Sequence, residues 1–191
     1  RDFKRMLAYS SIEHMGILCI ATSLGGPGVW AALFHVWSNG LTKGALFLSA
    51  GNLQRAAGSS SIDDVRGMFK VMPRSSMLLV TGMFAITACP PFGPFFSELL
   101  VVRTGFAAGQ GWAMAFFLTC LLLAFFGLSR TVFAVVDGRP RLKKRTPLKE
   151  SCGLILPPLL LLAASLWLGL FTPDILRDAW SAAVLQLFPT P

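Results

Sequence analysis

Long apolar runs alternate with short polar segments along this chain. A helix that crosses a membrane needs about 20 mostly apolar residues, because the hydrocarbon core is about 30 Å thick and a helix rises about 1.5 Å per residue. Five segments meet this requirement, so the pattern predicts an all-α transmembrane helical bundle with five spans. Their approximate ranges are 6–24, 28–53, 75–103, 111–136 and 152–172.

A sixth apolar stretch, 175–188, is too short to cross a membrane. Its Leu176, Trp180, Val184 and Leu187 recur near helical spacing, while most of its polar residues fall between them. This pattern predicts a short C-terminal helix that lies in the membrane interface.

The third span contains strong helix breakers. The sequence places Pro90, Pro91, Gly93 and Pro94 within five residues, and such a run cannot continue an unbroken helix. The apolar run resumes afterwards, which favours one crossing built from two half-helices. Broken helices at membrane depth lie in a protein interior or beside a water-filled cavity. The alternative is that the helix ends at Pro90 and a re-entrant or external loop begins, with Glu98 solvated.

Composition supports the membrane assignment. The 191 residues are 54% hydrophobic and only 14% charged, whereas soluble domains carry about 25% charged residues. The net charge of +8 does not indicate nucleic-acid binding, because the basic residues form short clusters between apolar runs. The four cysteines show no metal-binding spacing, and we predict no metal and no cofactor in this chain.

The distribution of basic residues predicts an orientation. If the five spans alternate, then the N-terminus and the segments 54–74 and 137–150 share one side, with 13 of the 17 lysines and arginines. The opposite side carries only Arg103 and Arg177. Because cytoplasmic loops are enriched in Lys and Arg, we expect the N-terminus in the cytoplasm and the C-terminus outside.

Several ionisable residues lie within the predicted spans. A charged side chain at the centre of a spanning helix costs about 2.5–3.5 kcal/mol on insertion scales, so such residues are candidates for function. They are Glu13, His14, His35, Lys43, Glu98 and Arg130.

The most informative group is in segment 28–53. Because His35, Asn39 and Lys43 are spaced by four residues, they form one stripe that extends about 12 Å along the helix. An imidazole titrates near neutral pH, and an intramembrane lysine is rare and costly. The stripe therefore predicts a path for protons. The alternative is a polar seam in which His35 and Asn39 hydrogen-bond to a neighbouring helix.

The other ionisable residues leave more than one interpretation. Glu13 and His14 are adjacent, so they point about 100° apart and cannot both face one cavity squarely. Glu98 follows the broken segment by about one helical turn, as expected at an ion site. Arg130 lies within two turns of the cytoplasmic end of its span and either extends to the interface or belongs to the proton path.

Three motifs carry a resemblance to a known family. They are Asp2–Ser11, then His35–Lys43 with Leu46–Gly51, then Pro90–Glu98. Together they resemble the antiporter-like membrane subunits of respiratory complex I, Mrp-type cation/proton antiporters, membrane-bound [NiFe] hydrogenases and formate hydrogenlyases. Ser11–Gly16 is most similar to the hydrogenase-type component F branch.

The resemblance implies a 14-helix fold built from two inverted five-helix repeats. Residues 1–191 would form a single transmembrane domain, namely most of the second repeat plus a final helix, and the N-terminal repeat would be absent. Lys43 would be the central proton acceptor, His35 the first histidine of the pathway and Glu98 its terminal residue. Asn39 stands where relatives often have a second histidine, so this step would use water or the amide.

The resulting hypothesis is a proton-translocating subunit of a hydrogenase-type or complex I-like redox complex in a bacterial or archaeal plasma membrane. Its partners would be the lipid bilayer, other membrane subunits and a peripheral redox module. One alternative is an Mrp-type subunit that exchanges Na⁺ or K⁺ for protons. Another is a structural membrane anchor or a non-functional fragment.

Overall fold

The chain folds into a bundle of α-helices. A computed structural model describes residues 2–62, 64–139 and 150–188, and these contain no β-strand. The helices are α1 (Phe3–Ser23), α2 (Gly26–Ala57), α3 (Pro73–Ile86), α4 (Gly93–Ala107), α5 (Gly111–Val136), α6 (Cys152–Leu170) and α7 (Asp174–Leu187), with a short 3₁₀-helix, η1, at Met68–Lys70. The prediction of an all-α fold is confirmed, with helix ends that differ from the predicted ranges by a few residues.

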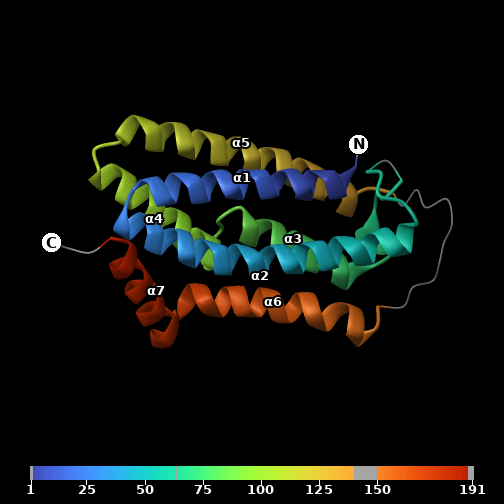
Figure 1. Cartoon of the computed structure of the whole chain (residues 1–191). Helices are drawn as coiled ribbons and strands as arrows, with labels where there is room; N and C mark the ends of the chain where they lie inside the picture. The colour runs from blue at the N-terminus through green and yellow to red at the C-terminus, as the bar shows by residue number, and fades with distance from the viewer. Residues whose placement is uncertain (1, 63, 140–149, 189–191) are drawn as a thin grey trace.

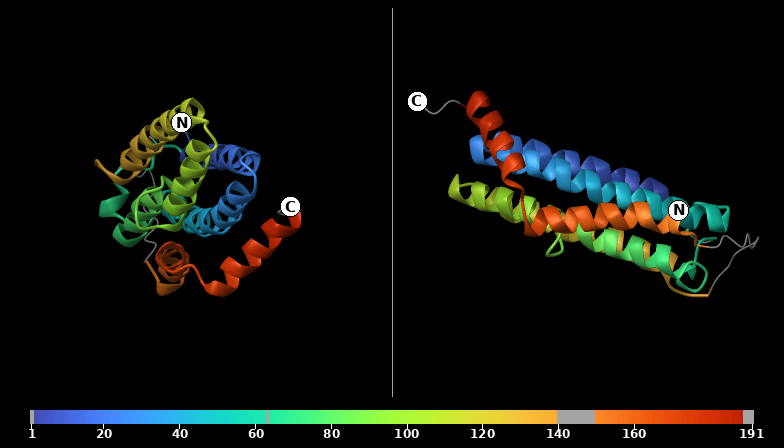
Figure 2. Two further views of the ribbon diagram at one scale, coloured as in Figure 1. Left: turned by 90° about the vertical axis from the view of Figure 1, so that its left-hand side faces the viewer. Right: turned by 90° about the horizontal axis from the view of Figure 1, so that it is seen from below.

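Helix α2 is the centre of the bundle. It contains 32 residues and is therefore about 48 Å long. It packs against α1, α3, α4, α6 and α7, which surround it in Figures 1 and 2. The predicted turn before it is shorter than expected, because only Gly25 has positive φ, and Pro27 and Gly28 already belong to the first turn of α2. The stripe predicted on residues 28–53 thus lies on the most enclosed helix.

The predicted interruption of the third span is confirmed. Helix α3 ends at Ile86 and α4 begins at Gly93, and the two follow one another with the break about half-way along the bundle (Figure 1). Proline is tolerated in the first turn of a helix, where its missing N–H group has no helical partner, which explains why α4 starts here. The alternative of a solvated Glu98 is wrong, because this side chain is only 5% exposed.

One end of the bundle gathers the segments predicted to share a side. Asp2 pairs with Ser61 in an isolated bridge, and the backbone N–H of Gly67 donates to the carbonyl of Asp137 at 3.0 Å. The Ser75 N–H donates to the Glu150 carboxylate at 2.7 Å. These segments therefore lie at one end of the bundle, as the alternation predicts. The basic residues of 140–149 lie outside the described residues.

Helix α7 lies near the opposite end of the bundle. It runs at an angle to the bundle axis along the outer side of α2, as Figure 2 shows. Trp180 is buried there and packs its ring against Trp30 at 5.5 Å and Phe34 at 5.7 Å between centroids. The predicted C-terminal helix is confirmed, and its buried tryptophan fixes it to α2.

Two helices are long and apolar enough to cross a membrane by length and composition, namely α5 and α6. Helices α1 and α2 have sufficient length, but polar residues lower their hydropathy. The outward side chains of α5 include Phe116, Leu123 and Phe126, all exposed. A helix with apolar side chains on its outer face fits a hydrocarbon environment.

Candidate functional site

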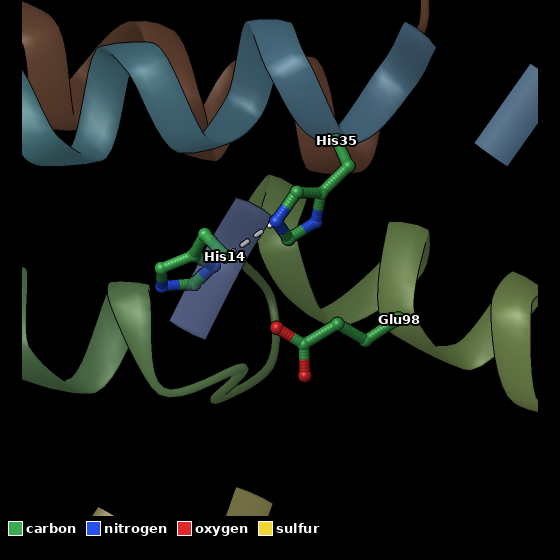
Figure 3. A group of neighbouring side chains, drawn as sticks. All are labelled: His14, His35 and Glu98. Atoms are coloured by element: carbon green, nitrogen blue, oxygen red, sulfur yellow. Dashed lines mark hydrogen bonds between the residues drawn. The ribbon is translucent and has the colours of Figure 1, made fainter. Parts of the chain in front are cut away.

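The two histidines of this chain meet inside the bundle. His14 lies on α1 and His35 on α2, with exposed fractions of 2% and 0%. Nδ1 of His14 and Nε2 of His35 are 3.0 Å apart and share a hydrogen bond (Figure 3). The rings stack with centroids 5.1 Å apart. Because α1 and α2 run side by side in opposite directions, residues 21 positions apart in sequence reach one another.

A serine on α4 sets the direction of this hydrogen bond. The Ser97 hydroxyl donates to the Pro94 carbonyl at 2.8 Å, so its single proton is engaged and its oxygen accepts from Nδ1–H of His35 at 2.8 Å. With the proton of His35 on Nδ1, its Nε2 is an acceptor, and Nδ1–H of His14 donates to it. The donors therefore point in series from α1 to α2 to the start of α4.

Glu98 joins this pair from the half-helix that follows the break. Its carboxylate points toward the histidines (Figure 3), and one of its oxygens lies within 4.8 Å of a ring nitrogen of each. All three side chains are buried. The two imidazoles and one carboxylate form a compact set of groups that can exchange protons or hold a metal ion.

Close backbone packing at two glycines places α4 against its neighbours. A Cβ atom on Gly93 would meet the Ser38 Cβ of α2 at 2.5 Å, and one on Gly169 of α6 would meet the Pro91 carbonyl oxygen at 2.4 Å. Only glycine permits these approaches. The broken segment is thus held between α2 and α6, which positions Ser97 and Glu98.

Lys43 lies two turns along α2 from His35. Its side chain is half-buried, and Nζ donates to Ser11 Oγ at 2.8 Å and to Ser10 Oγ at 3.3 Å. Glu13 is close enough for a Coulombic interaction with both Lys43 and Glu98. The amine therefore rests on hydroxyl groups of α1, with a carboxylate nearby.

Asn39 lies between His35 and Lys43 on the same face of α2, as the spacing predicts. It is buried, and its Oδ1 has no hydrogen-bond partner among the described residues. Buried amide oxygens in folded proteins are normally satisfied by protein or by ordered water. Asn39 thus presents an acceptor along the stripe.

Arg130 is not brought to this cluster. It is exposed on α5 and lines a cavity of about 530 Å³ together with Arg66, Asp137 and Arg139, near the end of the bundle that holds the α2–α3 connection. The structure thus groups Arg130 with surface charges, which agrees with the interpretation of a side chain that extends to the interface.

Ser97, which orients His35, was not among the predicted site residues. Its position immediately before Glu98 was the available signal, but a serine in an apolar helix is too common to single out. The hydroxyls of Ser10 and Ser11 were seen only as part of a motif. Their contact with Lys43 depends on the register of α1 against α2, which the sequence pattern leaves open.

A family profile and the sequence of a curated protein both match this chain. The profile of the family described as NADH:quinone oxidoreductase/Mrp antiporter, TM, matches residues 1–124. The hydrogenase-4 component F homolog of Methylacidiphilum infernorum is 38% identical over 142 residues, which cover 74% of this chain and 30% of that protein.

Solved structures have the same arrangement of helices. A chain of the Mrp complex from Dietzia sp. DQ12-45-1b superposes with a TM-score of 0.81 at 20% identity, over 96% of this chain and 42% of that one. A chain of the membrane-bound sulfane sulfur reductase, an archaeal respiratory membrane complex, gives 0.75 at 26% identity, over 95% and 37%. This chain spans less than half the length of each of these proteins.

Proposed function

Because this chain belongs to the NADH:quinone oxidoreductase/Mrp antiporter family, we propose that its buried cluster conducts protons across a membrane. The observation that carries the proposal is the hydrogen-bonded series from His14 through His35 to Ser97, with Glu98 beside it. Ionisable side chains inside a membrane domain are costly and mark ion or proton pathways. Five such residues on the described helices lie at or near this cluster.

The histidine pair supplies the central transfer. A proton that reaches Nε2 of His14 allows Nδ1–H of His14 to pass its proton to Nε2 of His35 along their 3.0 Å contact. His35 is then an imidazolium ion near the Glu98 carboxylate, within 4.8 Å, a separation that one water molecule can bridge. Glu98 is thus the acceptor from the pair.

We assign Lys43 as the residue from which protons reach the histidine pair. Its backbone lies about 12 Å from that of His35 along α2, and we infer that an intermediate carrier connects the two side chains. The Asn39 oxygen between them offers a hydrogen-bond acceptor that a water molecule can use. Once His35 has been protonated, a new positive charge on Lys43 repels the charge on His35 and so favours transfer of the His35 proton to Glu98.

The membrane assignment extends this proposal. We infer five crossings, formed by α1, α2, the α3–α4 pair, α5 and α6, with α7 in the interface. The end that gathers residues 2, 61, 67, 75 and 150 would face the cytoplasm, because it receives the basic segments. Protons would then enter near Lys43 and leave beyond Glu98, in a plasma membrane of a bacterium or archaeon.

The proposed setting is a redox complex of the hydrogenase type, with other membrane subunits and a peripheral redox module as partners. The 38% identity to a hydrogenase-4 component F homolog supports this branch. Co-purification with nickel and iron–sulfur subunits would distinguish it from a cation/proton antiporter that carries Na⁺. We infer that this subunit contributes proton movement and that electron transfer takes place in the partners.

Replacement of Lys43 tests the proposal. Proteoliposomes would contain the complex with the full-length subunit, either unchanged or with Lys43→Ala, and internal acidification would be followed with a fluorescent dye. We expect acidification to fall to that of vesicles without the complex. Lys70→Ala, which changes an exposed residue of η1, is the matched control and should acidify normally. Normal acidification by Lys43→Ala would refute the proposal.

A further inference from the structure

We propose that His14, His35 and Glu98 form a binding site for a divalent transition-metal ion, with Zn²⁺ the best-suited ion, and that the bound ion blocks proton movement. Binding follows from the side-chain geometry alone, whereas the block rests on the proposed function. Two imidazole nitrogens and one carboxylate are a common ligand set for Zn²⁺, which favours four-coordinate tetrahedral geometry.

The spacing of the ligand atoms is close to what the ion requires. Zinc ligands at about 2.0–2.1 Å from the metal lie about 3.4 Å from one another in a tetrahedral site. Nδ1 of His14 and Nε2 of His35 are already 3.0 Å apart, and the carboxylate oxygen lies within 4.8 Å of them. A movement of this oxygen by at most about 1.4 Å would bring it to the ligand separation of a tetrahedral site.

Ser97 provides a second, independent feature of a metal site. Metal-binding histidines usually donate the N–H of their other ring nitrogen to a fixed acceptor, which sets the tautomer and the direction of the ring. His35 does this through Nδ1–H to Ser97 Oγ, which is itself held by the Pro94 carbonyl. Its Nε2 lone pair therefore faces Nδ1 of His14. His14 binds through Nδ1 once the proton on that nitrogen is released.

A cavity adjoins the site at Glu98. It has a volume of about 470 Å³ and lies between the α3–α4 break, α4 and α5, with Glu98 in its wall. Its other lining residues are mainly apolar and include Phe95, Leu118 and Phe125. Neither histidine lines this cavity, so it borders the site only at Glu98. Three protein ligands leave one tetrahedral position open, and we infer that a water molecule fills it.

Metal binding would use the same atoms as proton transfer. A bound ion takes the lone pairs of His14 Nδ1 and His35 Nε2, so the hydrogen bond between them cannot form. It also neutralises the Glu98 carboxylate, which the proposed function assigns as the acceptor. Zinc would therefore act as an inhibitor of this subunit rather than as a resident cofactor.

The test measures zinc binding and proton movement on one preparation. The purified complex with the full-length subunit is dialysed against ⁶⁵Zn²⁺, and X-ray absorption at the zinc edge reports the ligands. We expect His35→Gln and Glu98→Gln each to remove one zinc ion per subunit or to weaken its binding at least tenfold. Asp178→Asn, an exposed carboxylate on α7, should bind zinc as the unchanged complex does.

Each outcome supports or overturns either the zinc site or the block of proton movement. A zinc spectrum of the unchanged complex with two imidazole ligands and an oxygen ligand supports the site even where a variant does not fold. A spectrum without imidazole ligands overturns it. Equal zinc in the unchanged complex and in both variants overturns the site and leaves the proton proposal standing. Zinc bound at these residues without slower acidification of proteoliposomes overturns the block and contradicts the proposed relay.

Discussion

Nδ1 of His14 lies 3.0 Å from Nε2 of His35, and the two residues are the only histidines of the chain. Their contact joins α1 to α2 at the level of the break between α3 and α4. Because the Ser97 hydroxyl oxygen accepts from Nδ1–H of His35, Nε2 of His35 is the acceptor in this contact and Nδ1–H of His14 is the donor. Buried hydrogen-bonded groups of this kind rigidify a site, since an unpaired member would be costly.

The Ser97 hydroxyl should matter for transfer although it does not itself titrate. Ser97→Ala removes the acceptor of His35 Nδ1–H, and the loss of one hydrogen bond worth about 0.5–1.5 kcal/mol corresponds to about a 2- to 10-fold slower proton flux. Flux would be measured by acidification of proteoliposomes. Ser76→Ala is the matched control, because Ser76 Oγ is buried without a partner among the described residues. Equal flux in both variants would exclude this role.

Gly169 should be intolerant of a side chain. A Cβ there would meet the Pro91 carbonyl oxygen at 2.4 Å, so Gly169→Ala forces the broken segment away from α6. We expect a loss of stability of about 1–3 kcal/mol, measured by thermal unfolding in detergent. Gly40→Ala, whose Cβ would meet nothing within 4 Å, should be neutral or slightly stabilising. Similar unfolding of both variants would show that the close packing is not required.

Trp180 should hold α7 against α2. Its ring is buried against Trp30 and Phe34, and truncation of a buried tryptophan costs about 3–5 kcal/mol. We expect Trp180→Ala to expose α7 to limited proteolysis in detergent, with faster cleavage within 174–187. Trp112→Ala removes a side chain that is 82% exposed and should leave the cleavage rate unchanged. Equal rates in the two variants would place the anchor of α7 elsewhere.

Cysteine labelling can test which end of the bundle faces the cytoplasm. Cys152 is exposed at the start of α6, at the end of the bundle proposed to face the cytoplasm. In a background with the other three cysteines replaced by alanine, a membrane-impermeant maleimide should label Cys152 in inverted vesicles and not in intact cells. Asp174→Cys, with Cys152 also replaced, should give the opposite result. The reverse pattern would invert the proposed direction of proton movement.

Much of the fold could be predicted from local features of the sequence. Apolar runs of sufficient length indicated α1, α2, α5 and α6, because a helix must match the thickness of the hydrocarbon core. The prolines near residue 90 indicated the interruption between α3 and α4, since proline cannot continue a helix. Four-residue spacing placed His35, Asn39 and Lys43 on one face of α2, which depends only on helical geometry.

The remaining features depend on how the helices pack. The contact of His14 with His35 needs the register of α1 against α2, and no periodicity within one helix fixes that register. The role of Ser97 follows from the rotation of α4 after the break, which Gly93 and Gly169 set through close approaches to other helices. Trp180 was expected in the interface, yet it is buried against Trp30 and Phe34 of α2, a contact that depends on how α7 packs.

The proton-to-electron ratio of the Glu98→Gln complex tests the central claim most directly. The glutamine keeps the size of the side chain but removes its capacity to accept a proton. We predict fewer protons moved per electron than in the unchanged complex, with electron transfer still measurable, while Asp174→Asn on exposed α7 keeps the full ratio. An undiminished ratio in Glu98→Gln would contradict the account, because protons would then cross without the carboxylate beside the two histidines.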